Sequence, residues 1–311
     1  MIWSISSFKQ FQRCQRKWFL DEKVGSRSNK DAYRREIYLL SQLESIEAWR
    51  GKIVDYTISE FIIPKIQKKQ AINENEAIEF ARKLTRARYE FAKAEKHKEI
   101  GLKKTDHTYD YAALFDIEYS NSTVDLNDKL KRSWNEIETA LKNFLSNTEL
   151  INYLKGANYL VTQRALTYSL HDFTIKGVPD LIAFFPNQPP HIFDWKVHFF
   201  ATKTYNEQLL IYALALTNCN PHKDFINHIS NCNAYDVRLS EFQLLKNSLR
   251  NYNVTDDYIE IINDYIAEGI EKMKLKRCDS GYKELNIEHF EKTPNLDNCI
   301  NCQYKKICRE D

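Results

Sequence analysis

An acidic pair and a lysine mark the part of the chain whose chemistry is easiest to specify. Asp180 follows Pro179 at the start of an apolar segment, and Asp194 precedes Lys196 by two residues at the end of the next one. A hairpin of these segments would bring the carboxylates together, where they repel unless a cation neutralises them. Carboxylate oxygens suit Mg²⁺ or Mn²⁺, and the backbone carbonyl of Trp195 would supply a further oxygen ligand.

Lys196 and two residues of the following segment would complete a hydrolytic site. Because side chains alternate along a strand, Lys196 shares a face with Asp194. Its ammonium group would orient a metal-bound water or stabilise charge on a phosphate. Gln208 and Tyr212 stand four residues apart and share one face of a predicted helix. Taken singly, Asp194 with Lys196 could be a surface ion pair, Pro179-Asp180 a turn, and Gln208 with Tyr212 a half-buried helix stripe. The occurrence of all three together, at hairpin spacing, favours a site.

Four cysteines near the two ends of the chain form a second candidate site. They are Cys14, Cys299, Cys302 and Cys308. Four thiolates suit a [4Fe–4S] cluster, and the same ligands would also form a tetrahedral zinc site. Either metal would tie the termini together, so its binding energy would become folding energy. The remaining cysteines are expected to be buried, unreactive thiols: Cys219, Cys232 and Cys278.

Basic and aromatic residues surround the first of these cysteines. Arg13, Arg16, Lys17 and Trp18 flank Cys14. Cations beside an aromatic ring suit a groove that follows a nucleic-acid backbone and stacks a base. A solvated helix face with a core tryptophan is the equally plain alternative. These four residues are therefore candidate DNA contacts.

Composition limits the class of protein. The chain has 311 residues, a formal net charge of +2 and 13% aromatic residues, with only 7 Gly and 7 Pro, which is typical of an ordered globular protein. The longest apolar run, from Leu209 to Leu216, is too short to span a bilayer, so no membrane partner is expected. A cytoplasmic location follows, where thiols stay reduced and bind metals or lie buried.

The elements that must position these groups follow from apolar periodicity. Helices are expected over 4–20, 31–66, 74–100, 127–155, 205–217 and 240–275, with Pro64 ending the second. Strands are expected over 159–170, 173–185 and 191–196, with a turn at 171–172 and a further strand within 224–238. The expected parts are an N-terminal segment (1–30), a helical region (31–157), an α/β core (158–238) and C-terminal helices with a Cys-rich tail (239–311).

These residues carry a resemblance to a known family. Pro179-Asp180, Asp194-Trp195-Lys196 and Gln208-x-x-x-Tyr212, in this order, resemble the RecB-like branch of the PD-(D/E)XK nuclease superfamily. The four terminal cysteines are similar to those of its iron–sulfur members, the nucleases of CRISPR adaptation and of AddB-type helicase fusions. The resemblance implies a restriction-endonuclease-like α/β core sheet flanked by helices, with a structural [4Fe–4S] cluster.

The resemblance also implies roles for single residues. Asp180 and Asp194 would bind Mg²⁺ or Mn²⁺, Lys196 would serve the attacking water, and Gln208 and Tyr212 would position the strand. Two positions depart from the family pattern. Asp55 stands in the first core helix where relatives often have a metal-binding histidine, and it is expected to ligate the metal. Gln163 stands where a glutamate is common, which weakens a second metal position.

The expected function is hydrolysis of phosphodiesters in DNA, on single strands or ends, in DNA repair, recombination or antiviral (CRISPR) defence. The alternative is a catalytically weakened module that binds DNA ends within a repair or defence complex, which Asp55 and Gln163 would explain. The chain has no Walker-type phosphate loop, because Gly51-Lys52 lacks the preceding glycine and the following Ser or Thr. A helicase or another repair or defence protein would therefore be a separate partner.

Overall fold

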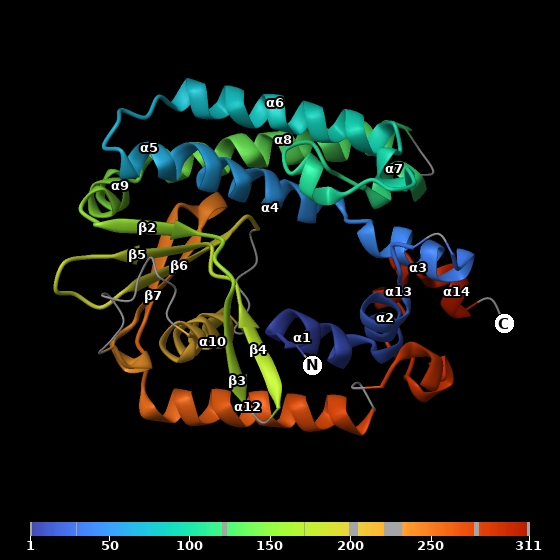
Figure 1. Cartoon of the computed structure of the whole chain (residues 1–311). Coiled ribbons are helices and arrows are strands. Elements are labelled where there is room, and N and C mark those ends of the chain that lie inside the picture. Colours follow the sequence, from blue (N-terminus) through green and yellow to red (C-terminus); the bar gives the residue numbers. More distant parts are fainter. Residues whose placement is uncertain are drawn as a thin grey trace.

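Two sheets and several layers of helices surround the centre of the molecule (Figure 1). The structure is a computed structural model, and it describes residues 2–28, 30–119, 123–170, 172–198, 205–220, 232–276 and 280–309. The mixed α/β architecture, with sheets flanked by helices, agrees with the expected restriction-endonuclease-like class. Within the described residues, no helix is both long and apolar enough to cross a membrane.

The strands form a large and a small sheet. The larger sheet has the order β2-β5-β6-β7-β8 and contains β2 (Tyr159–Thr162), β5 (Leu181–Phe184), β6 (His191–Lys196), β7 (Arg238–Gln243) and β8 (Ser248–Tyr252). The smaller sheet has the order β1-β4-β3 and contains β1 (Ile2–Trp3), β3 (Leu166–Leu170) and β4 (Phe173–Gly177). Among the named strand pairs of the described residues, β6–β7 and β1–β4 are parallel and the others are antiparallel.

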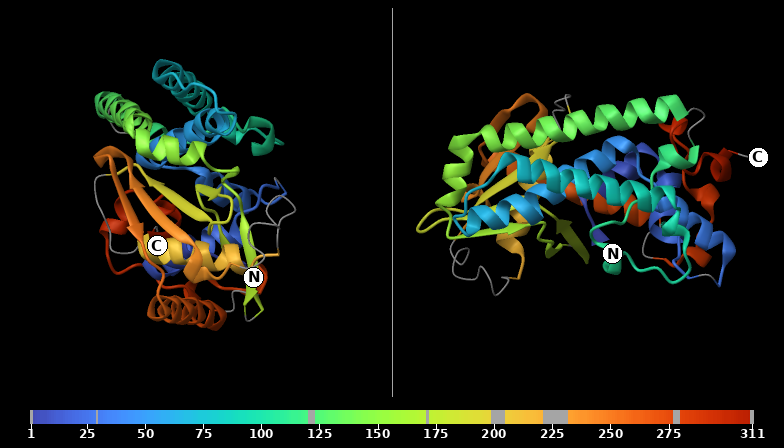
Figure 2. Two further views of the ribbon diagram at one scale, coloured as in Figure 1. Left: turned by 90° about the vertical axis from the view of Figure 1, so that its left-hand side faces the viewer. Right: turned by 90° about the horizontal axis from the view of Figure 1, so that it is seen from above.

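Helices cover both faces of the larger sheet (Figures 1 and 2). The upper layer contains α4 (Ile46–Thr57), α5 (Ile63–Gln67), α6 (Glu74–Lys93), α7 (Phe115–Tyr119), α8 (Thr123–Ser146) and α9 (Thr148–Lys155). The lower layer contains α1 (Ile5–Arg13), α10 (Tyr205–Asn218) and α12 (Asp256–Leu275). At the end of the molecule that carries the C-terminus (right in Figure 1) lie α2 (Gln15–Phe19), α3 (Ala32–Gln42), α13 (Asp297–Ile300) and α14 (Lys305–Arg309).

The sheet separates two apolar cores. The lower core gathers residues of α1, α10 and α12, with Phe8, Ile211 and Ile266 fully buried. The upper core gathers residues of α4, α6 and α8, with Ile53, Leu84 and Phe144 fully buried. The residues of β6 alternate between the two cores, because Ile192 joins the lower one while Phe193 and Trp195 join the upper one. A strand buried on both faces holds its polar residues firmly in place.

The helix expected over 31–66 is interrupted. Leu43 and Glu44 are extended, and Glu44 forms a β-bridge with Leu114. Ser45 then caps α4 by accepting a hydrogen bond from the backbone N–H of Ala48. Pro64 does not end the helix, because it lies in the first turn of α5, directly after a π-helical turn over Ile58–Ile62 that changes the hydrogen-bond register.

The prediction of one long helix over 240–275 is wrong for its first third. Two strands, β7 and β8, occupy residues up to Tyr252, and α12 begins only at Asp256 behind the cap of Thr255. The polar residues Glu241 and Gln243 are not typical of a buried strand, so the sequence pattern did not indicate one. In the structure both are fully buried beside β6. The strand expected within 224–238 and the turn at residue 171 lie largely outside the described residues.

The helix expected over 4–20 is divided at Cys14, which ends α1 and caps α2. Its Sγ atom accepts a hydrogen bond from the backbone N–H of Lys17 at 3.4 Å. The C-terminal segment packs against α2, where the rings of Phe19 and Phe290 stack with centroids 4.2 Å apart. Side-chain packing therefore already joins the two ends of the chain.

Candidate active site

The β5–β6 hairpin brings the two aspartates together, as the sequence predicted. Leu181 pairs with Phe193, so Asp180 lies beside Asp194 at one end of this strand pair. The backbone N–H of Trp195 donates to Asp180 Oδ2 at 2.7 Å, which holds that carboxylate against the end of β6. Asp194 is 3% exposed and belongs to a strand that is buried on both sides.

Asp55 and Gln163 enter the same site from the upper layer and from the end of β2. Gln163 has a left-handed backbone (φ 49°) immediately after β2. Its side-chain amide donates to Asp55 Oδ1 at 2.8 Å and to Asp180 Oδ1 at 3.0 Å. The amide therefore bridges two carboxylates that would otherwise repel each other. Both departures from the family pattern meet in this one contact.

Lys196 and the face of α10 complete the cluster. Lys196 Nζ forms an ion pair with Asp194 Oδ2 and lies 3.4 Å from Gln208 Oε1. The Gln208 amide donates to Asp194 Oδ1 at 3.4 Å and also contacts the hydroxyl of Tyr212 one turn later. All five residues assigned to catalysis from the sequence, Asp180, Asp194, Lys196, Gln208 and Tyr212, therefore lie within one network.

The cluster faces a cavity of about 470 Å³ between α4, β6 and α10. Asp55, Asp180, Asp194, Lys196 and Gln208 line it, together with Trp195. The cavity also reveals residues that the sequence analysis missed, all on α4 within two turns of Asp55: Glu47, Arg50 and Lys52. Counting back from Asp55 by three and by seven or eight would have found Lys52 and Glu47. Arg50 is tied to Glu136 and to the carbonyl of Val197, so it supports the wall of the cavity.

The carboxylates destabilise one another in the absence of a cation. Burial raises the pKa of Asp55 to about 7, and the charge of Asp194 adds to the effect. Burial, followed by the charges of Asp194 and Asp55, raises the pKa of Asp180 well above its usual range. Burial also raises the pKa of Asp194, although Lys196 opposes the change. A divalent cation at this point would remove the repulsion.

This electrostatic strain gives a pH-dependent stability. A carboxyl group whose pKa is higher in the folded than in the unfolded protein lowers the free energy of unfolding at pH values above its folded pKa. This destabilisation disappears below the unfolded pKa of 3.8, where the group is protonated in both states. Without added divalent cation, Asp55→Asn should therefore raise the melting temperature most at pH 8. The gain should shrink as the pH falls through about 7 towards 5. Thermal melts of both proteins across this range test the effect, and a gain that is constant with pH would contradict it.

The oxygen donors fit Mg²⁺ or Mn²⁺ in type, while their present contacts are with protein groups. Within the described part of the chain, no set of three or more His, Cys, Asp or Glu side chains is arranged as a ready metal site. The oxygens of Asp180 accept bonds from Gln163 and Trp195, and those of Asp194 contact Lys196 and Gln208. Metal binding therefore requires side-chain rotation to exchange these partners. The role of Asp55, Asp180, Asp194 and the Trp195 carbonyl as ligands stays a prediction.

A glycine of β4 controls the position of Tyr212. A Cβ added at Gly177 would lie 2.8 Å from Tyr212 Cδ1, closer than side chains can pack. We expect Gly177→Ala to displace the Tyr212 ring, weaken its contact with Gln208 and lower the expected phosphodiester hydrolysis by about tenfold, which corresponds to ~1.4 kcal/mol. The matched control is Gly281→Ala, because a Cβ there meets nothing closer than 4.0 Å. Equal cleavage rates for the two variants in a gel assay would show that Tyr212 has no positioning role.

The four candidate cluster cysteines line one cavity of about 250 Å³ between α2 and the C-terminal segment. Burial, and then the nearby thiols of Cys14 and Cys299, raises the pKa of Cys302. Soft sulfur donors gathered around one space fit an iron–sulfur cluster or zinc in type. Of the remaining cysteines, Cys219 is buried and Cys232 is half-buried, while Cys278 lies outside the described residues.

Two of the four residues expected to bind DNA have structural positions instead. Arg16 is 5% exposed, pairs with Glu288 at 2.9 Å and donates to the carbonyl of Phe290 at 3.3 Å. Trp18 is 1% exposed and donates to Ser7 Oγ at 2.9 Å. Both residues contact the C-terminal segment and help to hold it against α2. Because both are buried, neither can contact a DNA strand at the surface. Arg13 is exposed, and Lys17 lines the cysteine cavity.

Comparison with known proteins shows the family to which the chain belongs. No curated protein matches the chain. The family model of the PD-(D/E)XK nuclease superfamily matches residues 2–309, almost the whole chain. Members of this superfamily are generally nucleases that use Mg²⁺ or Mn²⁺. The chain therefore belongs to the PD-(D/E)XK nuclease superfamily.

Proposed function

We propose that this protein is a metal-dependent deoxyribonuclease of the RecB-like branch, which hydrolyses phosphodiesters in single-stranded DNA or at DNA ends. The observation that carries the proposal is the convergence of Asp180, Asp194 and Lys196 beside Gln208 at one cavity. Their order in the sequence resembles that of a PD-(D/E)XK site, and the chain belongs to that superfamily. A role in DNA repair, recombination or antiviral defence, alongside a helicase or similar partner, remains part of the proposal.

The residues of the site would have different chemical roles. Asp180 and Asp194 would hold the metal with Asp55 and the Trp195 carbonyl, and the metal would supply Lewis-acid stabilisation and an acidified water. Lys196 lies close enough to Asp194 to donate to a water or to a phosphate oxygen at the same point. Gln208 links Lys196 to Asp194 and is itself held by Tyr212. This network fixes the ammonium group before the substrate arrives.

We further propose that Cys14, Cys299, Cys302 and Cys308 hold a structural [4Fe–4S] cluster. Their common cavity and their positions at the two ends of the chain support this role. Zinc is the alternative for the same four sulfurs. The cluster lies apart from the carboxylates, because the two cavities have no lining residue in common.

A binding module without catalysis is the second candidate. The contacts of Gln163 favour it, because an uncharged amide donates hydrogen bonds to two carboxylates at a position where relatives often place another acid. The test gives anaerobically purified protein labelled single-stranded and duplex DNA with Mn²⁺. Cleavage supports the nuclease. Tight binding without cleavage supports the module and overturns the catalytic proposal.

A further inference from the structure

We propose that a groove between α6 and α8 holds a segment of the single-stranded DNA substrate outside the catalytic cavity. This inference rests on the proposed nuclease function, which supplies the ligand. The two helices lie side by side in the upper layer (Figures 1 and 2). A cavity of about 420 Å³ opens between them, here called the α6–α8 groove. The lining residues that would bind DNA come from three helices: Trp49 of α4, Arg82, Arg86 and Tyr89 of α6, and Trp134 of α8.

Cations and aromatic rings meet in this groove. Arg82, Arg86 and Tyr89 are spaced by four and by three residues, so they share one face of α6. Trp134 belongs to the opposite wall, and the guanidinium carbon of Arg82 lies 5.2 Å from the centroid of its ring. Arginine beside half-buried aromatic rings suits phosphates with an unpaired base stacked between them. A paired base of a duplex has no free face for such stacking, so the groove suits single-stranded DNA.

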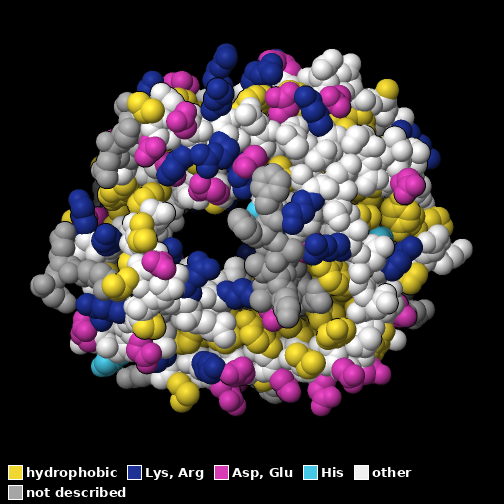
Figure 3. Space-filling view, turned by 180° about the vertical axis from the view of Figure 1, so that it is seen from behind, with side chains coloured by type: hydrophobic (Ala, Val, Ile, Leu, Met, Phe, Trp, Pro, Cys, Tyr) yellow, Lys and Arg dark blue, Asp and Glu magenta, His cyan; other side chains and the backbone are white. Residues whose placement is uncertain are grey.

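Both arginines are available to a phosphate. Arg86 is exposed, and no ion-pair partner is found for it among the described residues. Arg82 pairs with Glu79 at 3.0 Å, but both side chains are about half exposed, so this ion pair is weak and a phosphate can replace the carboxylate. Glu90 is the acidic group among the lining residues, so two guanidinium groups face one carboxylate. The groove therefore keeps a positive charge, in a layer where dark blue Lys and Arg side chains project at the top of Figure 3.

Trp49 links the groove to the catalytic cavity. It is 1% exposed, and within the described residues its indole N–H has no hydrogen-bond partner. A buried donor without a partner costs free energy, which an acceptor such as a base carbonyl would recover. Other residues of α4, among them Arg50 and Asp55, line the catalytic cavity. The two sites therefore lie on different sides of one helix, which is about 10 Å thick, so one strand can contact both by passing round α4.

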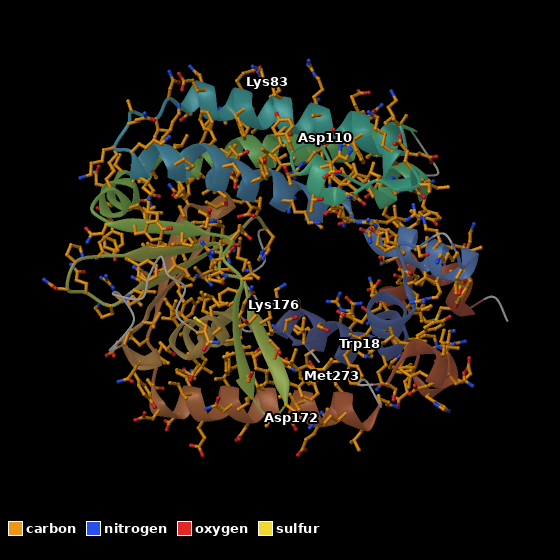
Figure 4. The ribbon with its side chains drawn as sticks, viewed as in Figure 1. Trp18, Lys83, Asp110, Asp172, Lys176 and Met273 are labelled. Atoms are coloured by element: carbon orange, nitrogen blue, oxygen red, sulfur yellow. The ribbon has the colours of Figure 1, made fainter. Side chains whose placement is uncertain are left out.

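Two substitutions test the groove, without divalent cation so that no strand is cleaved. Trp134→Leu should weaken binding of a labelled thymidine strand of about thirty nucleotides by about tenfold, because a stacking contact is lost. Arg86→Gln should weaken it by about fivefold and lower the slope of log Kd against log salt by about 0.7, because one phosphate contact is lost. Lys83→Gln is the matched control, because Lys83 projects outward from α6 (Figure 4), and it should change neither quantity. Fluorescence anisotropy at several salt concentrations measures both.

Two further measurements identify what the groove binds. Wild-type protein should bind an abasic strand of the same length about tenfold more weakly than the thymidine strand, because phosphates alone cannot stack on Trp134. With Mn²⁺, Trp134→Leu should raise KM for the thymidine strand by about tenfold with little change in kcat. This split is expected because the groove holds the substrate away from the carboxylates and does not touch the reacting atoms.

The outcomes separate the groove from the nuclease function. Equal binding by the Arg86, Trp134 and Lys83 variants would overturn the groove as a DNA site and leave the nuclease intact. Weaker binding by the first two, from a wild-type protein that does not cleave, would support the groove and overturn the nuclease. An abasic strand bound as tightly as the thymidine strand would overturn stacking, and weaker binding with unchanged KM would overturn the assignment to the substrate strand. Because Arg86 is exposed, its variant keeps the test valid even if Trp134→Leu fails to fold.

Discussion

Asp194→Asn and Lys196→Met are expected each to reduce Mn²⁺-dependent DNA cleavage by about a thousandfold, or ~4 kcal/mol of transition-state stabilisation. The asparagine keeps the shape of Asp194 but removes the charge that would hold the metal. The methionine keeps most of the volume of Lys196 and removes the ammonium group that contacts both Asp194 and Gln208. Initial rates on a labelled single strand measure the loss.

The control is the same substitution at an exposed lysine of α6, Lys83→Met, which should leave the rate unchanged. Both active-site variants should still unfold in one cooperative transition and bind DNA within about threefold of wild type, because the substitutions change only two side chains that line the cavity. If either retained more than a tenth of the wild-type rate while folded, the assigned catalytic site would be wrong.

Replacing two of the proposed cluster ligands should cost the protein its proposed metal and much of its stability. The double variant Cys299→Ser with Cys302→Ser removes half of the sulfurs from the cavity between the termini. Packing of Phe19 on Phe290 and the Arg16–Glu288 ion pair still join these segments. We therefore expect a loss on the order of 5 kcal/mol, less than for a small zinc domain, and a melting temperature lower by about 10 °C.

Iron analysis, visible absorption and thermal melts measure this effect. Cys232→Ser is the matched control, since Cys232 is half-buried and lies outside the cysteine cavity. The control should keep its iron and its melting temperature. Zinc in place of iron would change the identity of the metal but not its structural role. A double variant that keeps full metal content and stability would exclude these cysteines as ligands.

The carboxylate hairpin could be predicted because it depends on local information. Asp180 and Asp194 belong to adjacent strands joined by a short Pro-rich turn, so alternation along each strand sets the face of each side chain. Gln208 and Tyr212 were likewise fixed by the spacing of one helix. The interruption at Leu43 and the strand at Glu241 could not be predicted, because distant partners, Leu114 and β6, stabilise them.

By itself the sequence determined the chemistry: hard oxygen donors with a lysine at one strand end, and soft sulfur donors shared between the termini. The tertiary structure decided which groups are accessible. It buried Arg16 and Trp18 and bridged Asp55 to Asp180 through Gln163. Residue type and local spacing specify which atoms a side chain offers, whereas burial and enclosure depend on segments that meet only when the whole chain is folded.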